Sequence, residues 1–189
     1  MVKWQVTNIQ ATAYFDTIIK IDRLAEISSE DFTVSYNPEN YPGLIFYHKK
    51  FSAIIFRTGS IKITGIKKAK DFFLSIEELK KILKNYNINL PEKYTLRVAN
   101  IHISGKFDYN NIDIERMGLE LEDAFYDPER FPAVIVYYRI SPDIKAALNV
   151  FKNGSFAGVG LKCNINEITQ CIDKLLNEFQ EKIIKKFTK

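Results

Sequence analysis

The chain has 189 residues, of which 46% are hydrophobic and 13% aromatic, so it can bury a core as one domain or as two joined halves and is not a disordered tail. Its formal net charge of +4 permits a polyanionic partner without requiring one. No signal-peptide pattern opens the sequence, and its longest apolar runs, such as "PAVIVYY", are too short to span a bilayer. We expect a soluble protein with no membrane partner.

The first half of the chain predicts several strands closed by one long helix. A strand is expected over "WQVTNIQATAYF" (residues 4–15) and a short helix over "IDRLAEISSED" (21–31). Three runs of β-branched and aromatic residues, bounded by Pro and Gly, then predict the strands "GLIFYHK", "SAIIFR" and "SIKITGI". The closing helix should begin near Ala69, which makes the capping-box pattern of Ser75 and Glu78 accidental.

The second half repeats this plan. A strand over residues 94–107 and a short helix over 111–123 precede further strands, and Asn164 with Glu167 marks the start of the last helix. Cys163 and Cys171 should be reduced core thiols on this same helix, because no third ligand stands near them at metal-binding spacing. The apolar residues that should cover one face of a sheet recur at helical spacing, and they are Ile165, Ile168, Ile172, Leu175, Leu176, Phe179 and Ile183.

An internal repeat relates the two halves. At an offset of 90 positions, Tyr36, Pro38, Glu39 and Pro42 recur as Tyr126, Pro128, Glu129 and Pro132. At an offset of 95, after an insertion, Phe56, Gly59, Gly65 and Lys67 recur as Phe151, Gly154, Gly160 and Lys162. At an offset of 92, Asn8 recurs as Asn100. The sequence therefore predicts two copies of one unit, residues 1–93 and 94–189.

The side of the sheet away from the helices is expected to be apolar. A half-solvated strand alternates apolar and polar residues. Ile54, Phe56, Ile61 and Ile63 instead lie among neighbours such as Ile55 that are apolar too. An uncovered apolar face on a soluble protein indicates a binding surface.

The "YNPENYPGL" and "YDPERFPAV" motifs, the "IIFRTGSIKITGIKK" hairpin and the paired "TNI" and "ANI" strands resemble the TATA-binding protein family over nearly the whole chain. The resemblance implies an α+β fold in which two pseudo-symmetric repeats form one curved antiparallel sheet, a saddle with helices on its convex face. It also implies a monomer on double-stranded promoter DNA, whose concave face sits in the minor groove and kinks the duplex with aromatic wedges. Because the minor groove carries little hydrogen-bond information, shape and deformability supply the selectivity.

Carried over by motif, the wedges fall on Tyr41, Phe56, Phe131 and Phe151, followed in the two loops by Pro42 and Pro132. Taken singly, each ring is better explained as a core residue, and its recurrence at the matching repeat position is what favours a wedge. Full burial of Phe131 and Phe151 would support a plain α/β domain with accidental repeats. The implied groove floor consists of Asn8, Gln10, Lys62, Thr64, Asn100, His102, Ala157 and Val159.

The floor and the phosphate contacts depart from the family pattern. Gln10, Lys62 and His102 replace apolar floor residues, which weakens the expected preference for TATA, although the neighbouring strand could instead satisfy His102. Ser60 and Ser155 replace lysines, and Tyr47 and Tyr137 replace arginines. The phosphate contacts implied to remain are Arg57, Lys67 and Lys162.

The two loops that carry the wedges, called stirrups in this family, imply protein partners. Asp127 and Glu129 in the second stirrup correspond to the acidic patch that receives transcription factor IIB, and Arg130 replaces an apolar neighbour there. The first stirrup, "NPENYPG", is the edge where a strand of transcription factor IIA would pair.

The sequence therefore favours a transcription initiation factor that binds and bends promoter DNA and recruits other factors, in the nucleus or, in an archaeon, in the cytoplasm or nucleoid. The alternative is an interaction protein with weak TATA binding that scaffolds or sequesters initiation factors. No phosphate-binding loop, nucleophile elbow or His/Cys cluster predicts an enzyme or a cofactor.

Overall fold

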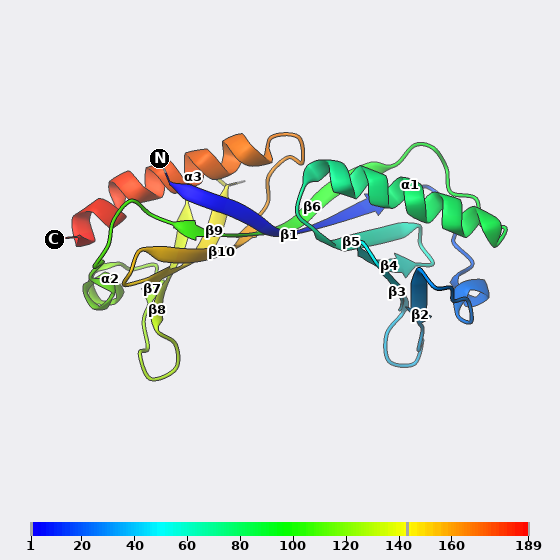
Figure 1. Ribbon diagram of the computed structural model, residues 1–189, viewed down its shortest axis with the longest axis horizontal. Coiled ribbons are helices and arrows are strands. Elements are labelled where there is room, and N and C mark those ends of the chain that lie inside the picture. The colour runs from blue at the N-terminus through cyan, green and yellow to red at the C-terminus, as the bar shows by residue number, and fades with distance from the viewer. Residues whose placement is uncertain (1, 143, 189) are drawn as a thin grey trace. The chain divides into compact units, whose positions relative to one another are not determined.

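The computed structural model of the chain describes residues 2–142 and 144–188 (Figure 1). The chain divides into two compact units. We call Asn8–Ala99 the N-terminal unit, and Met1–Thr7 with Asn100–Lys189 the C-terminal unit. After Thr7, the first copy of the internal repeat lies in the N-terminal unit, and the second copy lies mainly in the C-terminal unit. Residues 1–7, which open the first copy, belong to the C-terminal unit.

The N-terminal unit consists of a strand-rich sheet and one long helix. Its elements are β1 (Lys3–Tyr14, which starts in the other unit), the 3-10 helix η1 (Ile21–Leu24), β2 (Phe32–Ser35), β3 (Gly43–His48), β4 (Ser52–Phe56), β5 (Ser60–Ile66) and α1 (Ala69–Asn85). In β5, Ile61 and Ile63 are completely buried, whereas the alternate residues are only half-buried. This alternation places one side of the sheet under α1, whose Phe72 and Ile76 are fully buried.

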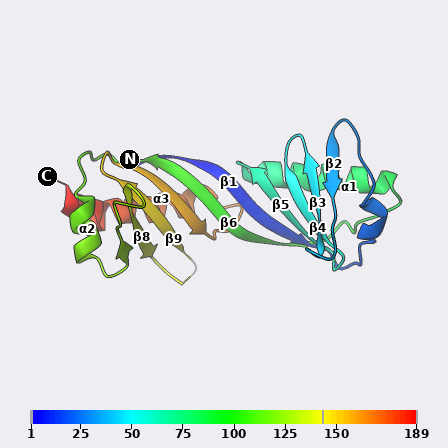
Figure 2. The same ribbon diagram turned by 90° about the horizontal axis from the view of Figure 1, so that it is seen from below.

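The C-terminal unit repeats this arrangement. Its elements are β6 (Thr95–Lys106, which starts in the other unit), α2 (Ile114–Glu120), β7 (Ala124–Phe125), β8 (Ala133–Arg139), β9 (Lys145–Phe151), β10 (Ser155–Leu161), α3 (Ile168–Lys182) and the 3-10 helix η2 (Ile184–Phe187). Leu148 and Val150 of β9 are buried together with Leu175 and Phe179 of α3. In each unit the long helix lies on one side of the strands, and Figure 2 shows the strands from the other side. We call that other side the open face of the unit.

The strand order is β2-β3-β4-β5-β1-β6-β10-β9-β8-β7 in one sheet, and every pairing with a defined register is antiparallel. From β2 to β5 and from β7 to β10, consecutive strands are joined as hairpins, the connection expected for short antiparallel strands. The prediction of an α+β fold with two repeats and a helix on one face of an antiparallel sheet is confirmed.

Several predicted boundaries were wrong. The segment 21–31 forms only the single 3-10 turn η1, and two short edge strands, β2 and β7, were missed. The last helix begins at Ile168 rather than near Asn164, whose side chain instead accepts a hydrogen bond from the Asn166 amide in a turn. The start of α1 at Ala69 is confirmed, and Ser75 lies inside that helix with its hydroxyl donating to the Asp71 carbonyl.

The prediction of two reduced thiols on one helix was also wrong. Cys163 lies before α3, Cys171 lies in its first turn, and the two form a disulfide with their Cα atoms 6.2 Å apart. Both cysteines are buried. The late start of α3 is the physical reason, because it leaves Cys163 in the irregular segment between β10 and α3, which folds back on the helix.

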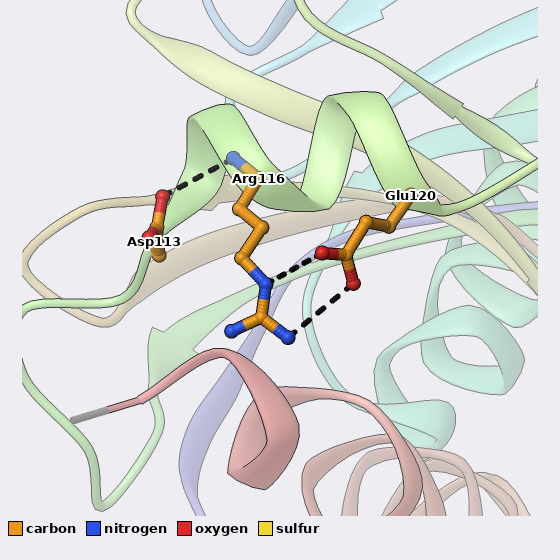
Figure 3. A network of polar contacts seen from close by, with 3 residues as sticks. All are labelled: Asp113, Arg116 and Glu120. Carbon is orange, nitrogen blue, oxygen red and sulfur yellow. Dashed lines mark hydrogen bonds and ion pairs between the residues drawn. The ribbon is translucent and has the colours of Figure 1, made fainter.

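Polar contacts join Asp113, Arg116 and Glu120 along α2 (Figure 3). Asp113 caps the helix by accepting from the Arg116 amide at 3.1 Å, and Arg116 forms a two-pronged ion pair with Glu120, with Nε–Oε1 2.7 Å. The Arg116 guanidinium also lies 5.0 Å from the ring centre of Phe187 in η2. Among the residues that the structure describes, no helix is long and apolar enough to cross a membrane.

Candidate nucleic-acid interface

Two aromatic pairs lie at matching places in the two units. In the N-terminal unit the ring centres of Tyr41 and Phe56 are 6.0 Å apart at an interplanar angle of 66°, and in the C-terminal unit those of Phe131 and Phe151 are 5.9 Å apart at 67°. Tyr41 is 40% exposed and Phe131 38% exposed, while Phe56 and Phe151 are half-buried. None of the four is a core residue, which contradicts the alternative of accidental repeats.

The stirrup loops hold these rings by the same turn. The carbonyl of Asn37 accepts from the Tyr41 amide, and the carbonyl of Asp127 accepts from the Phe131 amide, both at 2.9 Å. Each turn therefore fixes the backbone of its aromatic residue. The strand that follows the turn, β3 or β8, pairs with β4 or β9 and so brings the second ring, Phe56 or Phe151, beside the first. Edge-to-face packing keeps each pair rigid and partly exposed.

The two asparagines anchor matching irregularities in the sheet. In β5 and in β10 one extra residue interrupts the register against β1 and β6, and Gly65 and Gly160 lie at these bulges with φ of +84°. Asn8 Oδ1 accepts from the Gly65 amide at 2.9 Å, and Asn100 Oδ1 accepts from the Gly160 amide at 2.7 Å. Both asparagines are half-buried on the open face, so each can serve the bulge and still offer its amide nitrogen.

The second contact of each asparagine differs between the units. Asn8 Nδ2 lies 3.2 Å from the Thr64 hydroxyl. Asn100 Nδ2 lies 2.9 Å from His102 Nε2. His102 is therefore satisfied by a residue of its own strand, rather than by the neighbouring strand as the sequence allowed.

The cross-strand registers define the rest of each open face. One row of the N-terminal unit consists of Thr12, Lys62, Ile54 and Ile45, and the corresponding row of the C-terminal unit consists of Ser104, Ala157, Asn149 and Ile135. All eight residues are half-buried, so the two open faces are mixtures of apolar and polar groups. Sequence reasoning missed Asn149, although its repeat offset from Ile54 could have indicated it.

Two tyrosines at repeat-related positions are strongly exposed for aromatic residues. Tyr47 is 49% exposed and Tyr137 is 61% exposed. Tyr137 pairs with Ala147, which pairs with Val159, so these three residues form one row across the open face of the C-terminal unit. A cavity of about 620 Å³ lies elsewhere, between α1 and the Lys50 hairpin, and another of about 610 Å³ includes Tyr137 and Val159.

The three predicted phosphate contacts are exposed, but they differ in their partners. Arg57 donates to Asp22 of η1 at 2.7 Å, so a phosphate must compete with that carboxylate. Lys67 and Lys162 occupy matching exposed positions just after β5 and β10. Lys67 and Lys162 therefore form a pair of exposed cations that can be compared directly between the two repeats.

The second stirrup carries the predicted partner residues in different environments. Asp127 accepts from the Glu129 amide and forms an ion pair with Arg130, with Nε–Oδ2 3.4 Å, so it mainly shapes the loop. Glu129 and Arg130 are exposed. No group of three or more potential metal ligands occurs in residues 2–142 and 144–188.

Comparisons with known proteins agree with this geometry. A sequence profile described as "Transcription factor TFIID (or TATA-binding protein, TBP)" matches residues 3–86 and 95–182. These two matched segments correspond to the two copies of the internal repeat.

Individual relatives cover most of the chain. The TATA-box-binding protein of Pyrobaculum aerophilum is 32% identical over 180 residues, which are 94% of this chain and 86% of that protein. The TATA-box-binding protein of Methanobrevibacter smithii is 33% identical over 160 residues, 84% of either chain. The solved structure of Methanococcus jannaschii TBP has the same fold, with a TM-score of 0.77 and 24% identity over 95% of this chain and 99% of that one. The chain therefore belongs to the TATA-binding protein family.

Proposed function

We propose that this protein is a general transcription initiation factor that binds promoter DNA through the minor groove, bends it and recruits further initiation factors. The observation that carries the proposal is the recurrence, in each unit, of a partly exposed aromatic pair beside an open face with an anchored asparagine. Family membership supports the same activity. The protein works by binding and needs no covalent chemistry.

The physical roles follow from the residue types. Tyr41, Phe56, Phe131 and Phe151 are the wedges that partly unstack base steps, which costs a few kcal/mol per step and is offset by the larger contact that bent DNA allows. Asn8 and Asn100 donate to the N3 and O2 acceptors of the groove floor. Gln10, Lys62, Thr64, His102, Ala157 and Val159 form the remaining floor, and Arg57, Lys67 and Lys162 contact phosphates.

The test is equilibrium binding to short duplexes labelled at both ends, so that energy transfer reports the bend. One duplex carries a TATA element, and the others have its central A·T pairs replaced by G·C. We expect tight, bent binding to the TATA duplex. Phe131→Ala should lose most of the bend and about tenfold in affinity, because an aromatic ring stacked on a base contributes roughly 1–3 kcal/mol.

The matched control is Phe73→Ala. Phe73 is 37% exposed on α1, which lies on the side of the strands opposite the open face, so its loss should leave affinity and bend unchanged. Equal, weak and unbent binding of the wild-type protein to every duplex would overturn the proposal.

A second function is favoured by the polar floor and by Arg130. Lys62 and His102 sit on the open faces, and Arg130 is exposed in the second stirrup. The corresponding function is an interaction protein that scaffolds initiation factors with little DNA binding. The unbent outcome above would select it.

The proposed protein partners are a transcription factor IIB-like protein at Asp127, Glu129 and Arg130, and a transcription factor IIA-like strand at the first stirrup. Exposed Glu129 and Arg130 can form such contacts, whereas Asp127 is engaged within its loop. The relatives compared above are archaeal, so we place the protein at promoters in the nucleoid rather than in a nucleus.

A further inference from the structure

We propose that His102 is a positioning and specificity-determining residue: it holds the Asn100 carboxamide in the second repeat, the task that Thr64 performs for Asn8 in the first. The inference rests on the proposed function and deepens it. It makes the two halves of the interface chemically unlike, although they arose from one repeat.

The bulge determines how the Asn100 carboxamide is oriented. A backbone N–H can only donate, so the atom that faces the Gly160 amide at 2.7 Å must be the carbonyl oxygen Oδ1. The amide nitrogen Nδ2 is then the atom that lies 2.9 Å from His102 Nε2. A flipped carboxamide would set two donors against each other at Gly160.

The same contact determines the tautomer of His102. Nδ2 carries only donors, so Nε2 must be the unprotonated, accepting nitrogen of a neutral imidazole. The proton therefore resides on Nδ1. An imidazolium has no acceptor and could not hold Asn100 in this way.

The first repeat achieves the same orientation with a hydroxyl. Asn8 Oδ1 accepts from the Gly65 amide at 2.9 Å, and the Thr64 hydroxyl lies 3.2 Å from Nδ2 and 3.3 Å from Oδ1, so it contacts both ends of the carboxamide. At the repeat position of Thr64 the second half has Val159, which has no hydrogen-bonding group. At the repeat position of Gln10 the second half has His102. The contact with the asparagine that is lost at Val159 is therefore replaced by the contact from His102.

The exchange changes what the two halves offer to base edges. A threonine hydroxyl can donate or accept, so the first repeat can accommodate a guanine amino group as well as the A·T acceptors. His102 with its proton on Nδ1 adds only a donor, which suits N3 and O2 but opposes the guanine amino group. Discrimination against G·C should therefore be stricter in the half of the element read by the second repeat.

One experiment measures the free protein. Long-range proton–nitrogen spectra distinguish a proton on Nδ1 from one on Nε2, and the sequence has only two histidines, so His48→Gln assigns the signals. We expect the Nδ1-protonated tautomer at His102 in neutral solution, and loss of that preference in Asn100→Ala. An Nε2-protonated His102 would overturn the proposal whatever the protein does with DNA.

The second experiment uses the exchange between repeats. His102→Val should weaken binding to the TATA duplex about three- to tenfold, the range expected for one lost hydrogen bond, and the added change Val159→Thr should restore it. Thr64→Val should weaken binding in the same way and be rescued by Gln10→His. Melting curves of each variant establish that it is folded.

Duplexes with G·C placed in one half or the other of an asymmetric TATA element complete the test. His102→Val should relax discrimination in one half only, and Thr64→Val should affect binding to the opposite half. Failure of Val159→Thr to rescue His102→Val, or equal effects on both halves, would overturn the inference. If the wild-type protein binds none of the duplexes, the proposed function fails, while the tautomer measurement still decides whether His102 positions Asn100.

Discussion

At the scale of single residues, Asn8 and Asn100 have a structural task, to which our proposal adds a binding one. The carbonyl oxygen of each receives a bulge amide, which would otherwise lack a partner in the sheet. The amide nitrogen stays on the open face. An asparagine suits this position because it carries an acceptor and two donors on one rigid plane.

The glycine at the bulge gives a first prediction about stability. Gly160 and Gly154 share a φ of +84°, but a Cβ on Gly160 would meet nothing within 4 Å, whereas a Cβ on Gly154 would collide with the Tyr109 carbonyl oxygen. Gly160→Ala should therefore cost only the left-handed backbone strain, about 1–2 kcal/mol in the free energy of unfolding.

Gly154→Ala should cost clearly more, because the backbone must also move. Urea unfolding of the two variants without DNA measures the difference. Equal losses in the free energy of unfolding would mean that the backbone at Gly154 moves without cost and that the close approach to the Tyr109 carbonyl does not matter for stability.

The sequence predicted which aromatic and asparagine positions matter, but it did not predict their side-chain contacts. The repeat offsets paired the four aromatic residues and the two asparagines, and the family resemblance gave them their expected roles. The partner of Asn100 could not be inferred, since a histidine two residues along a strand becomes its neighbour only through local backbone and side-chain geometry.

At the scale of elements, two contacts of α3 give predictions about stability, one with strand β8 and one with the segment that precedes the helix. Tyr138 of β8 packs edge-on against Phe179, with ring centres 5.0 Å apart, and donates to Glu178 at 3.2 Å. Burial, with the charge of Glu178 and this hydrogen bond, raises the pKa of Tyr138 to about 12. The pKa of Glu178 is lowered, mainly because Lys182 donates a hydrogen bond to it.

The raised pKa of Tyr138 predicts an alkaline loss of stability. An unfolded tyrosine titrates near pH 10, so the contribution of Tyr138 is fully present below about pH 10 and is lost as the pH rises toward 12. In Tyr138→Phe the free energy of unfolding should decline less over this range, and the last step of tyrosinate absorbance should disappear. Tyr137→Phe, which removes the exposed neighbouring phenol, should leave that step in place. If the last absorbance step also remains in Tyr138→Phe, then the contacts of Tyr138 with Glu178 and Phe179 do not raise its pKa.

The disulfide is the second of these contacts of α3 and predicts a redox-dependent stability. Cys163 and Cys171 close a short loop, with a sequence separation of 8, so chain-entropy arguments give roughly 2–3 kcal/mol of stabilisation. Reductant should lower the melting temperature of the wild-type protein. The double change Cys163→Ser and Cys171→Ser should start at the lower value and ignore reductant. A wild-type protein insensitive to reductant, with both thiols free by chemical labelling, would contradict the bond.

The sequence predicted the long, periodic elements well and the short ones poorly. Strand β5 agrees with its predicted run, and α1 begins where expected, because many residues carry each signal. The edge strands β2 and β7 have four and two residues, so pairing with β3 and β8 decides them rather than any local pattern. The disulfide was missed for the same reason, because the short segment before α3 was predicted as helix.

At the scale of the whole molecule, the chain uses one duplicated unit to build two unlike open faces. The scaffold features recur: the stirrup turns, the aromatic pairs and the anchored bulges. The floor side chains between them do not recur, since Lys62 and Ile54 of one row correspond to Ala157 and Asn149 of the other. Such a chain should bind DNA with a preferred orientation, because the two halves offer different hydrogen-bonding groups to the groove.

The salt dependence of DNA binding tests whether both halves contact the same duplex. Lys67 and Lys162 lie at matching exposed positions after β5 and β10. Each phosphate contact contributes about 0.9 to the slope of log affinity against log salt concentration. Lys67→Ala and Lys162→Ala should therefore each reduce the slope by about that amount, and the double variant by about twice as much.

The matched controls for these two variants lie on the long helices. Lys81 of α1 and Lys174 of α3 are exposed, one in each unit, and their removal changes the net charge equally. The helices lie on the side of each sheet opposite the open face, so Lys81→Ala and Lys174→Ala should change the slope much less. If only one of Lys67→Ala and Lys162→Ala lowers the slope, a single half of the molecule contacts the backbone, and bending by two wedge pairs on one duplex is then untenable. Equal changes for helix and loop lysines would instead mean that the slope reports net charge alone.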